Sequence, residues 1–287
     1  MKNIYINAGY YNTKIATESQ LKIFESKVQF NEDAKRYIKI DDRKLEIGNG
    51  KRNINDKNNN MVNDYITIYS ILNLCDRIDS TNIILALPIN QYLNTELKND
   101  YKNKLMNRTL NYEIDGIKKI ITVEKVEVFM EGAAAMLNYN YKGIVGLIDI
   151  GGNTANCILF NNGKAILESI TQLDCSMLRL EKEIIDTVNI KKLSNYQDYE
   201  FDSLISSKNI EIKLIIDNLI NKFIDNLKYN LKLKKWNVDN LKLFFTGGGS
   251  LTLSAYIKDA FGNVEISEDP LFDNVKGLQK VGRVIFR

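Results

Sequence analysis

Residues 4–14 read IYINAGYYNTK, and residues 147–156 read LIDIGGNTAN. In both stretches an apolar strand runs into Asn or Asp, a glycine follows two positions later, a small polar cluster makes the turn, and a second strand leaves. Aligning Asn7 with Asp149 also aligns Gly9 with Gly151. The chain therefore contains the same hairpin pattern twice, which indicates an internal duplication.

The repeated turns predict a binding role. Successive backbone N–H groups in a turn form a concave site for anions. Two such hairpins facing each other across a cleft would direct two sets of N–H groups at one anion, such as the phosphates of a nucleotide. A single copy is also consistent with a plain turn that uses Asp and Gly for their backbone conformations, and the second copy weakens that alternative.

The composition indicates a globular protein and excludes several classes of activity. Of 287 residues, 44% are hydrophobic and 26% are charged, so the chain is long enough for two domains. The net charge of +3 is too small to predict direct binding to nucleic acid. The absence of histidine excludes Ser-His-Asp and Cys-His catalysis and the histidine-bearing zinc and iron sites.

The location expected from the sequence is the cytoplasm. No apolar run approaches the length of a membrane span, and the first residues lead straight into a strand without a signal peptide. The three cysteines, Cys75, Cys157 and Cys175, are scattered and odd in number. We therefore expect them to be small buried hydrophobic residues in a reducing compartment.

Hydrophobic periodicity predicts strands alternating with helices, which indicates an α/β architecture. Strands are expected at residues 3–8, 13–24, 83–88, 109–114, 118–123, 143–160 (the second hairpin), 164–171 and 241–245. Helices are expected at residues 65–75, 178–188, 211–235 and 251–260, with an amphipathic segment at 276–287. The segment from Gly48 to Asn60 is expected to be a polar surface loop.

Charged residues stand at both hairpins. Lys14 follows Asn7 across the first turn and could reach phosphate groups as a mobile point charge, although a solvated lysine on a plain hairpin has the same pattern. Asp149 ends the strand before the second turn. A carboxylate there suits a magnesium ion that keeps most of its water ligands, because Mg²⁺ needs only one or two carboxylates beside phosphate oxygens.

A third acidic candidate is Glu131, where the pattern changes from strand to helix within residues 126–137. A carboxylate at this junction could orient or deprotonate an attacking water. The alternative is an acid that stabilises the N-terminus of a helix. The residues themselves favour neither interpretation over the other.

Three glycines, Gly247 to Gly249, separate an apolar strand from a helix. They allow the main chain to lie against a flat ligand, and the helix N-terminus that follows favours a phosphate. A flexible loop is the alternative, but the flanking apolar elements favour the binding role. The chain has no P-loop sequence, and no G-x-G-x-x-G follows its first strand, which argues against a dinucleotide-binding fold.

The order of these motifs resembles that of the actin-like ATPase superfamily. They look like its first phosphate motif, first connecting motif, second phosphate motif and adenosine motif, in that order and over nearly the whole chain. The resemblance implies an actin-like ATPase fold, an α/β architecture with two ribonuclease-H-like halves around a nucleotide cleft. It also implies that ATP, or GTP, binds together with Mg²⁺.

The resemblance assigns a role to each motif. Asp149 would hold Mg²⁺ through water and take part in catalysis, Glu131 would act on the attacking water, and Lys14 would contact the phosphates. Lys182 and Glu183 are candidates for ribose or base contacts, with solvated helix charges as the alternative. The remaining nucleotide-binding positions would be Asn7, Gly9, Tyr10, Tyr11, Asn12, Gly151, Gly152, Asn153, Thr154, Gly247, Gly248 and Gly249.

Within the superfamily the chain most resembles ParM-type bacterial actins, the filament-forming proteins that move plasmids apart. Its length and Glu131, where actin has glutamine, support this similarity. Asn7 departs from the family pattern, which has Asp at this position. An Asn can hydrogen-bond a metal-bound water but contributes no charge, so a role for Asn7 at the metal is possible only through water.

The resemblance implies a domain division and a function. Domain I would comprise residues 1–142, completed by the C-terminal helix 273–287, and domain II would comprise residues 143–272. The chain would assemble with itself into a filament, hydrolyse the nucleotide and segregate plasmid DNA through a DNA-binding adaptor, with neither direct DNA binding nor membrane contact. Two alternatives are a phosphotransferase of the same fold that acts on a sugar or carboxylic acid, and a non-polymerising actin relative of the cell-division type.

Overall fold

The computed structural model describes residues 1–52 and 61–286. The chain forms two compact units, which we call unit 1 (Met1–Asn140 with Leu271–Arg287) and unit 2 (Tyr141–Pro270). Each unit has its own sheet and its own hydrophobic core. No helix in the described ranges is long and apolar enough to cross a lipid bilayer.

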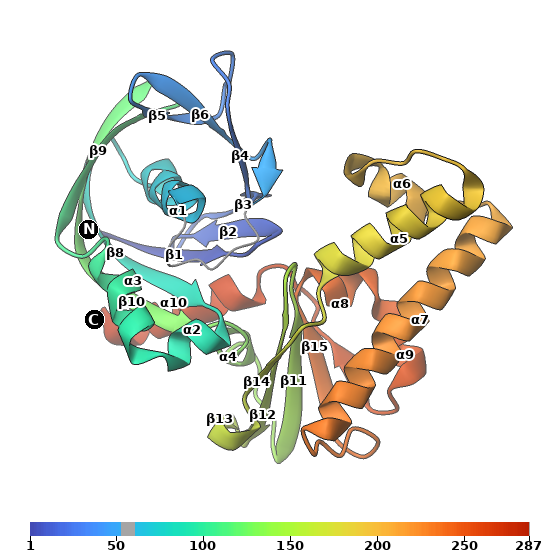
Figure 1. Cartoon of the computed structure of the whole chain (residues 1–287). Helices are drawn as coiled ribbons and strands as arrows, with labels where there is room; N and C mark the ends of the chain where they lie inside the picture. Colours follow the sequence, from blue (N-terminus) through green and yellow to red (C-terminus); the bar gives the residue numbers. More distant parts are fainter. Residues whose placement is uncertain (53–60, 287) are drawn as a thin grey trace. The chain divides into compact units, whose positions relative to one another are not determined.

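Within the described residues, unit 1 contains a ten-stranded sheet in the order β3-β2-β1-β8-β10-β9-β5-β6-β4-β7. Figure 1 shows its strands curving around helix α1, whose side chains Ile66, Tyr69 and Ile71 fill the core. The strands are β1 (Lys2–Ala8), β2 (Asn12–Ala16), β3 (Leu21–Glu25), β4 (Lys27–Phe30), β5 (Tyr37–Ile40), β6 (Arg43–Ile47), β7 (Lys51–Arg52), β8 (Ile78–Leu87), β9 (Arg108–Ile114) and β10 (Ile117–Met130). The helices are α1 (Met61–Leu74), α2 (Ile89–Leu93), α3 (Thr95–Asn103), α4 (Ala133–Met136) and α10 (Asp273–Ile285).

Unit 2 contains a sheet in the order β13-β12-β11-β15-β16, and β14 also pairs with β12. Its strands are β11 (Ile144–Ile150), β12 (Ala155–Asn161), β13 (Lys164–Ala165), β14 (Thr171–Leu173), β15 (Lys242–Thr246) and β16 (Val264–Ile266). Its helices are α5 (Met177–Lys192), α6 (Phe201–Ile205), α7 (Ile210–Leu233), α8 (Gly248–Thr252) and α9 (Ser254–Ala260), with 3₁₀ turns η2 (Leu167–Ser169) and η3 (Asp198–Glu200).

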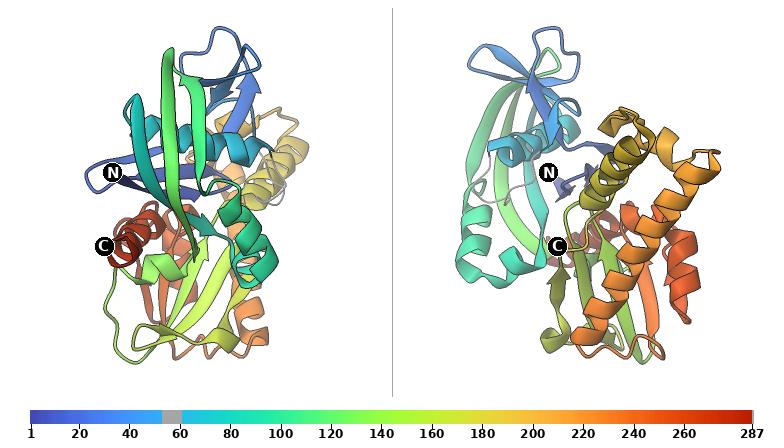
Figure 2. Two further views of the ribbon diagram at one scale, coloured as in Figure 1. Left: turned by 90° about the vertical axis from the view of Figure 1, so that its left-hand side faces the viewer. Right: turned by 45° about the vertical axis from the view of Figure 1, so that its right-hand side comes forward.

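The longest helix, α7, follows directly from its sequence. Asn209 caps it, because its side chain accepts hydrogen bonds from the amides of Glu211 and Ile212, which are among the donors that a helix start leaves unpaired. One face then repeats apolar residues at helical spacing. The buried members of that face are Ile212, Ile216, Ile220, Ile224, Leu227 and Leu231. Figure 2 shows α7 running alongside the strands of the unit 2 sheet.

The two units repeat one strand arrangement. In unit 1, β1 pairs with β2 antiparallel and with β8 parallel. In unit 2, β11 pairs with β12 antiparallel and with β15 parallel. The registers also correspond, because Asn7 lies opposite Lys14 and Asp149 lies opposite Asn156. The duplication expected from the two hairpin sequences is therefore present in the topology of both sheets.

Helix α10 belongs to unit 1 although it follows unit 2 in the sequence. Its buried side chains Val275, Leu278 and Val281 join a cluster with Tyr5 and Ala134. The helix crosses α4 so closely that a Cβ on Gly277 would lie 1.8 Å from the Ala134 carbonyl oxygen. Only glycine permits this approach of two backbones.

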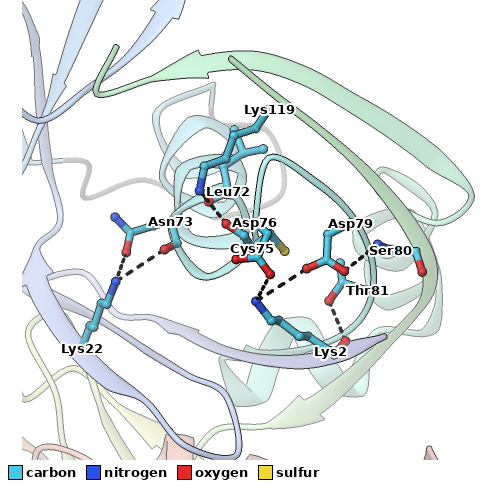
Figure 3. A network of polar contacts seen from close by, with 10 residues as sticks. All are labelled: Lys2, Lys22, Leu72, Asn73, Cys75, Asp76, Asp79, Ser80, Thr81 and Lys119. Carbon is cyan, nitrogen blue, oxygen red and sulfur yellow. Dashed lines mark hydrogen bonds and ion pairs between the residues drawn. The ribbon is translucent and has the colours of Figure 1, made fainter. Parts of the chain in front are cut away.

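A buried lysine binds the carbonyl oxygens at the C-terminal end of α1 (Figure 3). Lys119 of β10 donates hydrogen bonds from Nζ to the carbonyl oxygens of Leu72 (2.5 Å) and Cys75 (2.6 Å). The last carbonyls of a helix have no partner within the helix, and a cation there also interacts favourably with the helix dipole. Desolvation by burial lowers the pKa of Lys119. This contact fixes α1 to the sheet.

Several predicted boundaries were wrong. Residues 13–24 form two strands, because Thr17 accepts hydrogen bonds from the amides of Ser19 and Gln20 and makes a turn between them. Residues 164–171 hold two short strands around a 3₁₀ turn, in which the Ser169 hydroxyl donates to the Ile166 carbonyl. The helix expected at residues 251–260 begins at Gly248 and is divided into α8 and α9.

The predicted loop at residues 48–60 was also partly wrong. Lys51 and Arg52 form strand β7, which pairs with β4. Residues 53–60 of that prediction lie outside the described residues. Strands β4 to β6 of the same region were not predicted.

The close crossing of α4 and α10 predicts that a side chain at Gly277 lowers the stability of the protein. Replacing Gly277→Ala forces the two backbones apart, and we expect a loss of about 1–3 kcal/mol or more in the free energy of unfolding, as overpacking produces. Urea denaturation followed by circular dichroism measures this loss. Gly262→Ala is the matched control, because a Cβ at Gly262 meets no atom within 4 Å. Equal stability of the two variants would contradict the described packing.

The three cysteines are buried, as predicted. Burial raises the pKa of Cys75 to about 12 and that of Cys175 to about 11, from an ordinary value of 9.0. Above pH 9 the unfolded chain therefore releases thiol protons that the folded chain retains, so stability falls as the pH rises. We expect the urea midpoint in reducing buffer to decrease between pH 8 and 10. The double variant Cys75→Ala, Cys175→Ala should show a smaller decrease of the urea midpoint with pH. A decrease equal to that of the wild type would contradict the raised pKa values of these two thiols.

Candidate functional site

The first hairpin turn has its carbonyl oxygens bound from within unit 1. Ser26 donates from Oγ to the Gly9 carbonyl (2.5 Å) and from its amide to the Tyr11 carbonyl (3.0 Å). Lys14 donates from Nζ to the Asn12 carbonyl (3.2 Å). A Cβ on Gly9 would lie 2.8 Å from that same carbonyl oxygen, so this turn requires glycine.

The second turn has the same property in unit 2. The Gly151 amide donates to the Thr154 carbonyl (2.9 Å), and the first amides of α5 donate to the carbonyls of Gly151 (3.2 Å) and Gly152 (3.0 Å). Within the described part of the chain, the amides of Gly152, Asn153 and Thr154 donate no hydrogen bond. The turn therefore has N–H donors that are unpaired among the described residues, while the carbonyls of Gly151, Gly152 and Thr154 are occupied.

This arrangement gives the second turn the electrostatics of an anion site. A backbone segment whose carbonyls are already bound presents mainly the positive ends of its peptide dipoles. In unit 2 the turn contacts the start of α5 through the amides of Met177 and Leu178. Ser176 caps this helix by accepting a hydrogen bond from the amide of Arg179 (3.3 Å). Phosphate is the ligand class that such donor-rich turns bind most readily.

Asp149 lies within a row of polar side chains across the unit 2 sheet. It is 6% exposed at the end of β11, and its neighbours in register are Asn156 on β12 and Thr246 on β15. Asn156 in turn lies opposite Gln172 on β14. The side-chain oxygens of Asn156 and Gln172 are buried and accept no hydrogen bond among the described residues.

These acceptors fit the water ligands of a magnesium ion. A water bound to Mg²⁺ donates hydrogen bonds, and the ion itself needs only one or two carboxylates from the protein. In unit 1, the Oδ1 atom of Asn7 is also buried without a hydrogen-bond partner in the described chain. No group of three or more Cys, Asp or Glu side chains gathers among the described residues, so a site with protein ligands alone does not fit.

Gly247 is held against the Asp149 carboxylate. It has a positive φ of 83°, and its amide donates to the Pro270 carbonyl (3.1 Å). A Cβ on Gly247 would lie 2.3 Å from Asp149 Oδ1. Gly248 and Gly249 begin α8 rather than forming a loop, and Gly249 is buried against Ile150. The glycine run therefore brings the start of α8 next to Asp149.

Glu131 lies at the strand-to-helix junction predicted for it. Its amide donates to the Leu87 carbonyl (2.8 Å), and its residue is 9% exposed. Gly132 then turns the chain with a φ of 78°, and its amide donates to Asn274 Oδ1 (2.8 Å). The position of Glu131 is thus fixed on both sides by hydrogen bonds within unit 1. Gly132 directly precedes α4.

The other predicted positions are distributed as follows. Tyr10, Tyr11 and Asn12 lie in or beside the first turn. Lys182 and Glu183 are exposed on α5, and Glu183 forms an ion pair with Lys222 of α7 (3.0 Å). No described hydrogen bond or ion pair joins Lys182 or Glu183 to the second turn.

Three residues beside the turns were missed by the sequence reasoning. Ser26 contacts the first turn from the end of β3, and no local sequence signal indicates this. Asn156 and Gln172 lie next to Asp149 through strand pairing. The position of Asn156 could have been found, because it is seven residues after Asp149, as Lys14 is seven residues after Asn7.

Replacing Gly247 by alanine has two energetic costs, the backbone strain of a positive φ and the steric overlap of the new Cβ with Asp149. A second glycine allows the two costs to be measured separately. Gly163 also has a positive φ (77°), but a Cβ there meets no atom within 4 Å. We expect Gly163→Ala to lose about 1 kcal/mol of stability from backbone strain alone. Gly247→Ala should lose clearly more, because its Cβ must also displace Asp149 or Ile150. Urea denaturation of both variants measures the difference, and similar losses would contradict the contact.

Comparison with known proteins agrees with this geometry. Residues 6–133 match the family model of the N-terminal domain of actin-like proteins. No curated protein matches the sequence. Among solved structures, apo ParM of psk41 has 18% identity and a TM-score of 0.73, covering 99% of this chain and 98% of that one.

Two further structures are more similar in fold. Ta0583, an archaeal actin homologue in complex with ADP, has 17% identity and a TM-score of 0.82, covering 99% of this chain and 100% of that one. A 15-stranded ParM filament from Clostridium botulinum has 16% identity and a TM-score of 0.81, with 99% of both chains covered. The chain therefore has the actin-like ATPase fold, as the order of its motifs predicted.

Proposed function

We propose that this actin-like chain is a filament-forming bacterial actin that binds and hydrolyses ATP, or GTP, with Mg²⁺. Its filament segregates plasmid DNA through a DNA-binding adaptor protein, without direct contact to DNA. Support comes from the fold shared over the full chain with an ADP complex of Ta0583 and with a ParM filament. The sequence motifs support the same proposal independently of the fold comparison.

The observation that carries the proposal is the state of the two hairpin turns. In each turn the carbonyl oxygens are bound by groups of the same unit, at Gly9 and Tyr11 in one and at Gly151 and Gly152 in the other. Amides presented in this way bind phosphate oxygens. Lys14, which now donates to the Asn12 carbonyl, supplies a positive charge to the phosphates.

The two acidic residues, Asp149 and Glu131, would bind the metal and act on the attacking water, respectively. Asp149 would hold Mg²⁺ through water, and the unsatisfied amide oxygen of Asn7 could accept a hydrogen bond from a metal-bound water. The metal would neutralise charge on the phosphates. Glu131, fixed at its junction, orients the attacking water or takes its proton.

The adenosine would bind along Gly247 to Gly249, as the motif order implies. Gly248 is the partly exposed member of this run, whereas Gly247 and Gly249 pack against Asp149 and Ile150. Lys182 and Glu183 remain the candidates for the ribose or base. The nucleotide would contact these two side chains on the exposed surface of α5. Glu183 would first have to break its ion pair with Lys222.

Light scattering with pelleting tests assembly and hydrolysis together. We expect wild-type protein to form sedimenting polymer with ATP or GTP and then to disassemble as the nucleotide is consumed. Glu131→Ala should assemble but fail to disassemble, with phosphate release reduced about 10²–10⁴-fold. The matched control is Glu124→Ala, which removes an exposed acid from β10, the strand that leads to Glu131. This variant should behave like the wild type.

Two outcomes contradict the proposal. Wild-type protein that stays monomeric at high concentration with every nucleotide and with a non-hydrolysable analogue opposes filament formation. Transfer of phosphate to a sugar or a carboxylic acid, in place of water, would identify a phosphotransferase of the same fold.

A further inference from the structure

Arg52 reaches the first turn because of two glycines in the segment that precedes it. Gly48 and Gly50 both have positive φ values, of 93° and 92°, which L side chains rarely adopt. A Cβ on Gly50 would lie 2.5 Å from the Val28 carbonyl oxygen. The chain therefore turns tightly against β4, and β7 pairs with it so that Arg52 lies opposite Lys27.

The guanidinium group of Arg52 makes three contacts with the hairpin. Nη1 donates to the Tyr11 carbonyl (2.6 Å), Nη2 donates to Glu25 Oε2 (2.7 Å), and Cζ lies 3.9 Å from the centroid of the Tyr11 ring. Lys27 Nζ holds the same Glu25 oxygen at 2.6 Å. The Arg52 side chain is only 16% exposed, so water competes weakly for these contacts.

The Tyr11 carbonyl thus accepts two hydrogen bonds, one from Arg52 and one from the Ser26 amide. A carbonyl oxygen has two lone pairs, so its capacity is filled. In a trans peptide the C=O and the following N–H point in opposite directions. Fixing the Tyr11 carbonyl toward Arg52 therefore directs the Asn12 amide the other way.

We propose that Arg52 is a positioning residue of the first phosphate-binding turn. This inference rests on the proposed nucleotide binding and adds a residue from outside the hairpin to it. Arg52 and Ser26 donate hydrogen bonds to the carbonyl oxygens of the turn. These bonds hold the peptide groups with their N–H donors directed away from Arg52, the orientation that an anion requires. The turn is then ordered before the nucleotide arrives, so binding does not have to fix a flexible segment.

The test compares Arg52→Ala, Arg52→Lys and a matched control. Arg43→Ala removes another arginine that lies over an aromatic ring, with Cζ 4.0 Å from the Phe30 centroid, on a hairpin without a phosphate motif. Titration calorimetry with a non-hydrolysable triphosphate and Mg²⁺ gives the Kd. Hydrogen–deuterium exchange without nucleotide follows the amides of residues 9–12, and thermal melting reports global stability.

We expect Arg52→Ala to raise the Kd about 10-fold, as removal of an outer-shell partner does, and to speed exchange at residues 9–12. Lysine keeps the charge but lacks the planar fork that binds Tyr11 and Glu25 together, so Arg52→Lys should recover little of the loss. Arg43→Ala should match the wild type in Kd and in exchange at residues 9–12.

Three results would overturn the assignment. An Arg52→Ala protein with wild-type Kd and wild-type exchange removes the positioning role. Full recovery by Arg52→Lys shows that only the charge acts. A lower melting temperature with faster exchange across unit 1, and none specific to residues 9–12, shows a purely structural arginine. Wild-type protein that binds no triphosphate overturns the proposed function instead, while the exchange of its nucleotide-free turn still decides whether Arg52 orders it.

Discussion

The orientation of peptide groups in two short turns determines what this fold can bind. A turn has as many acceptors as donors, and it attracts an anion only when its carbonyls are turned away and satisfied. Unit 1 satisfies them with Ser26, Lys14 and Arg52, and unit 2 uses the first amides of α5. Equivalent turns are thus stabilised by unrelated groups, because different residues bind the carbonyls of each turn.

The central strands place the chemical groups beside these turns. Pairing of β1 with β2 brings Lys14 opposite Asn7, and pairing of β11 with β12 brings Asn156 opposite Asp149. The two halves therefore carry different residues at corresponding positions, a neutral–cationic pair in one and an anionic–neutral pair in the other. In the proposed function, the first half would contribute positive charge and the second would hold the metal.

Much of this could be predicted from the sequence where the signal is local. The turns, the strand β15 before Gly247 and the long helix α7 each have a periodic or glycine pattern that local physics dictates. Strand β7 was missed because its two residues, Lys51 and Arg52, are polar and pair only with the distant strand β4. The contact of Ser26 with Gly9 was missed for the same reason, since it depends on how β3 returns to the turn. The roles of Lys182 and Glu183 rest on the family resemblance alone.

The placement of α10 also affects how the polypeptide matures during synthesis. Unit 2 is one continuous stretch, so all of its strands are synthesised before α10. Unit 1 must wait for α10, because Tyr5 and Ala134 are covered by Val275, Leu278 and Val281. Strand β1 thus keeps part of its apolar surface uncovered until α10 has been synthesised. Unit 1 therefore completes its core only after unit 2 has been synthesised.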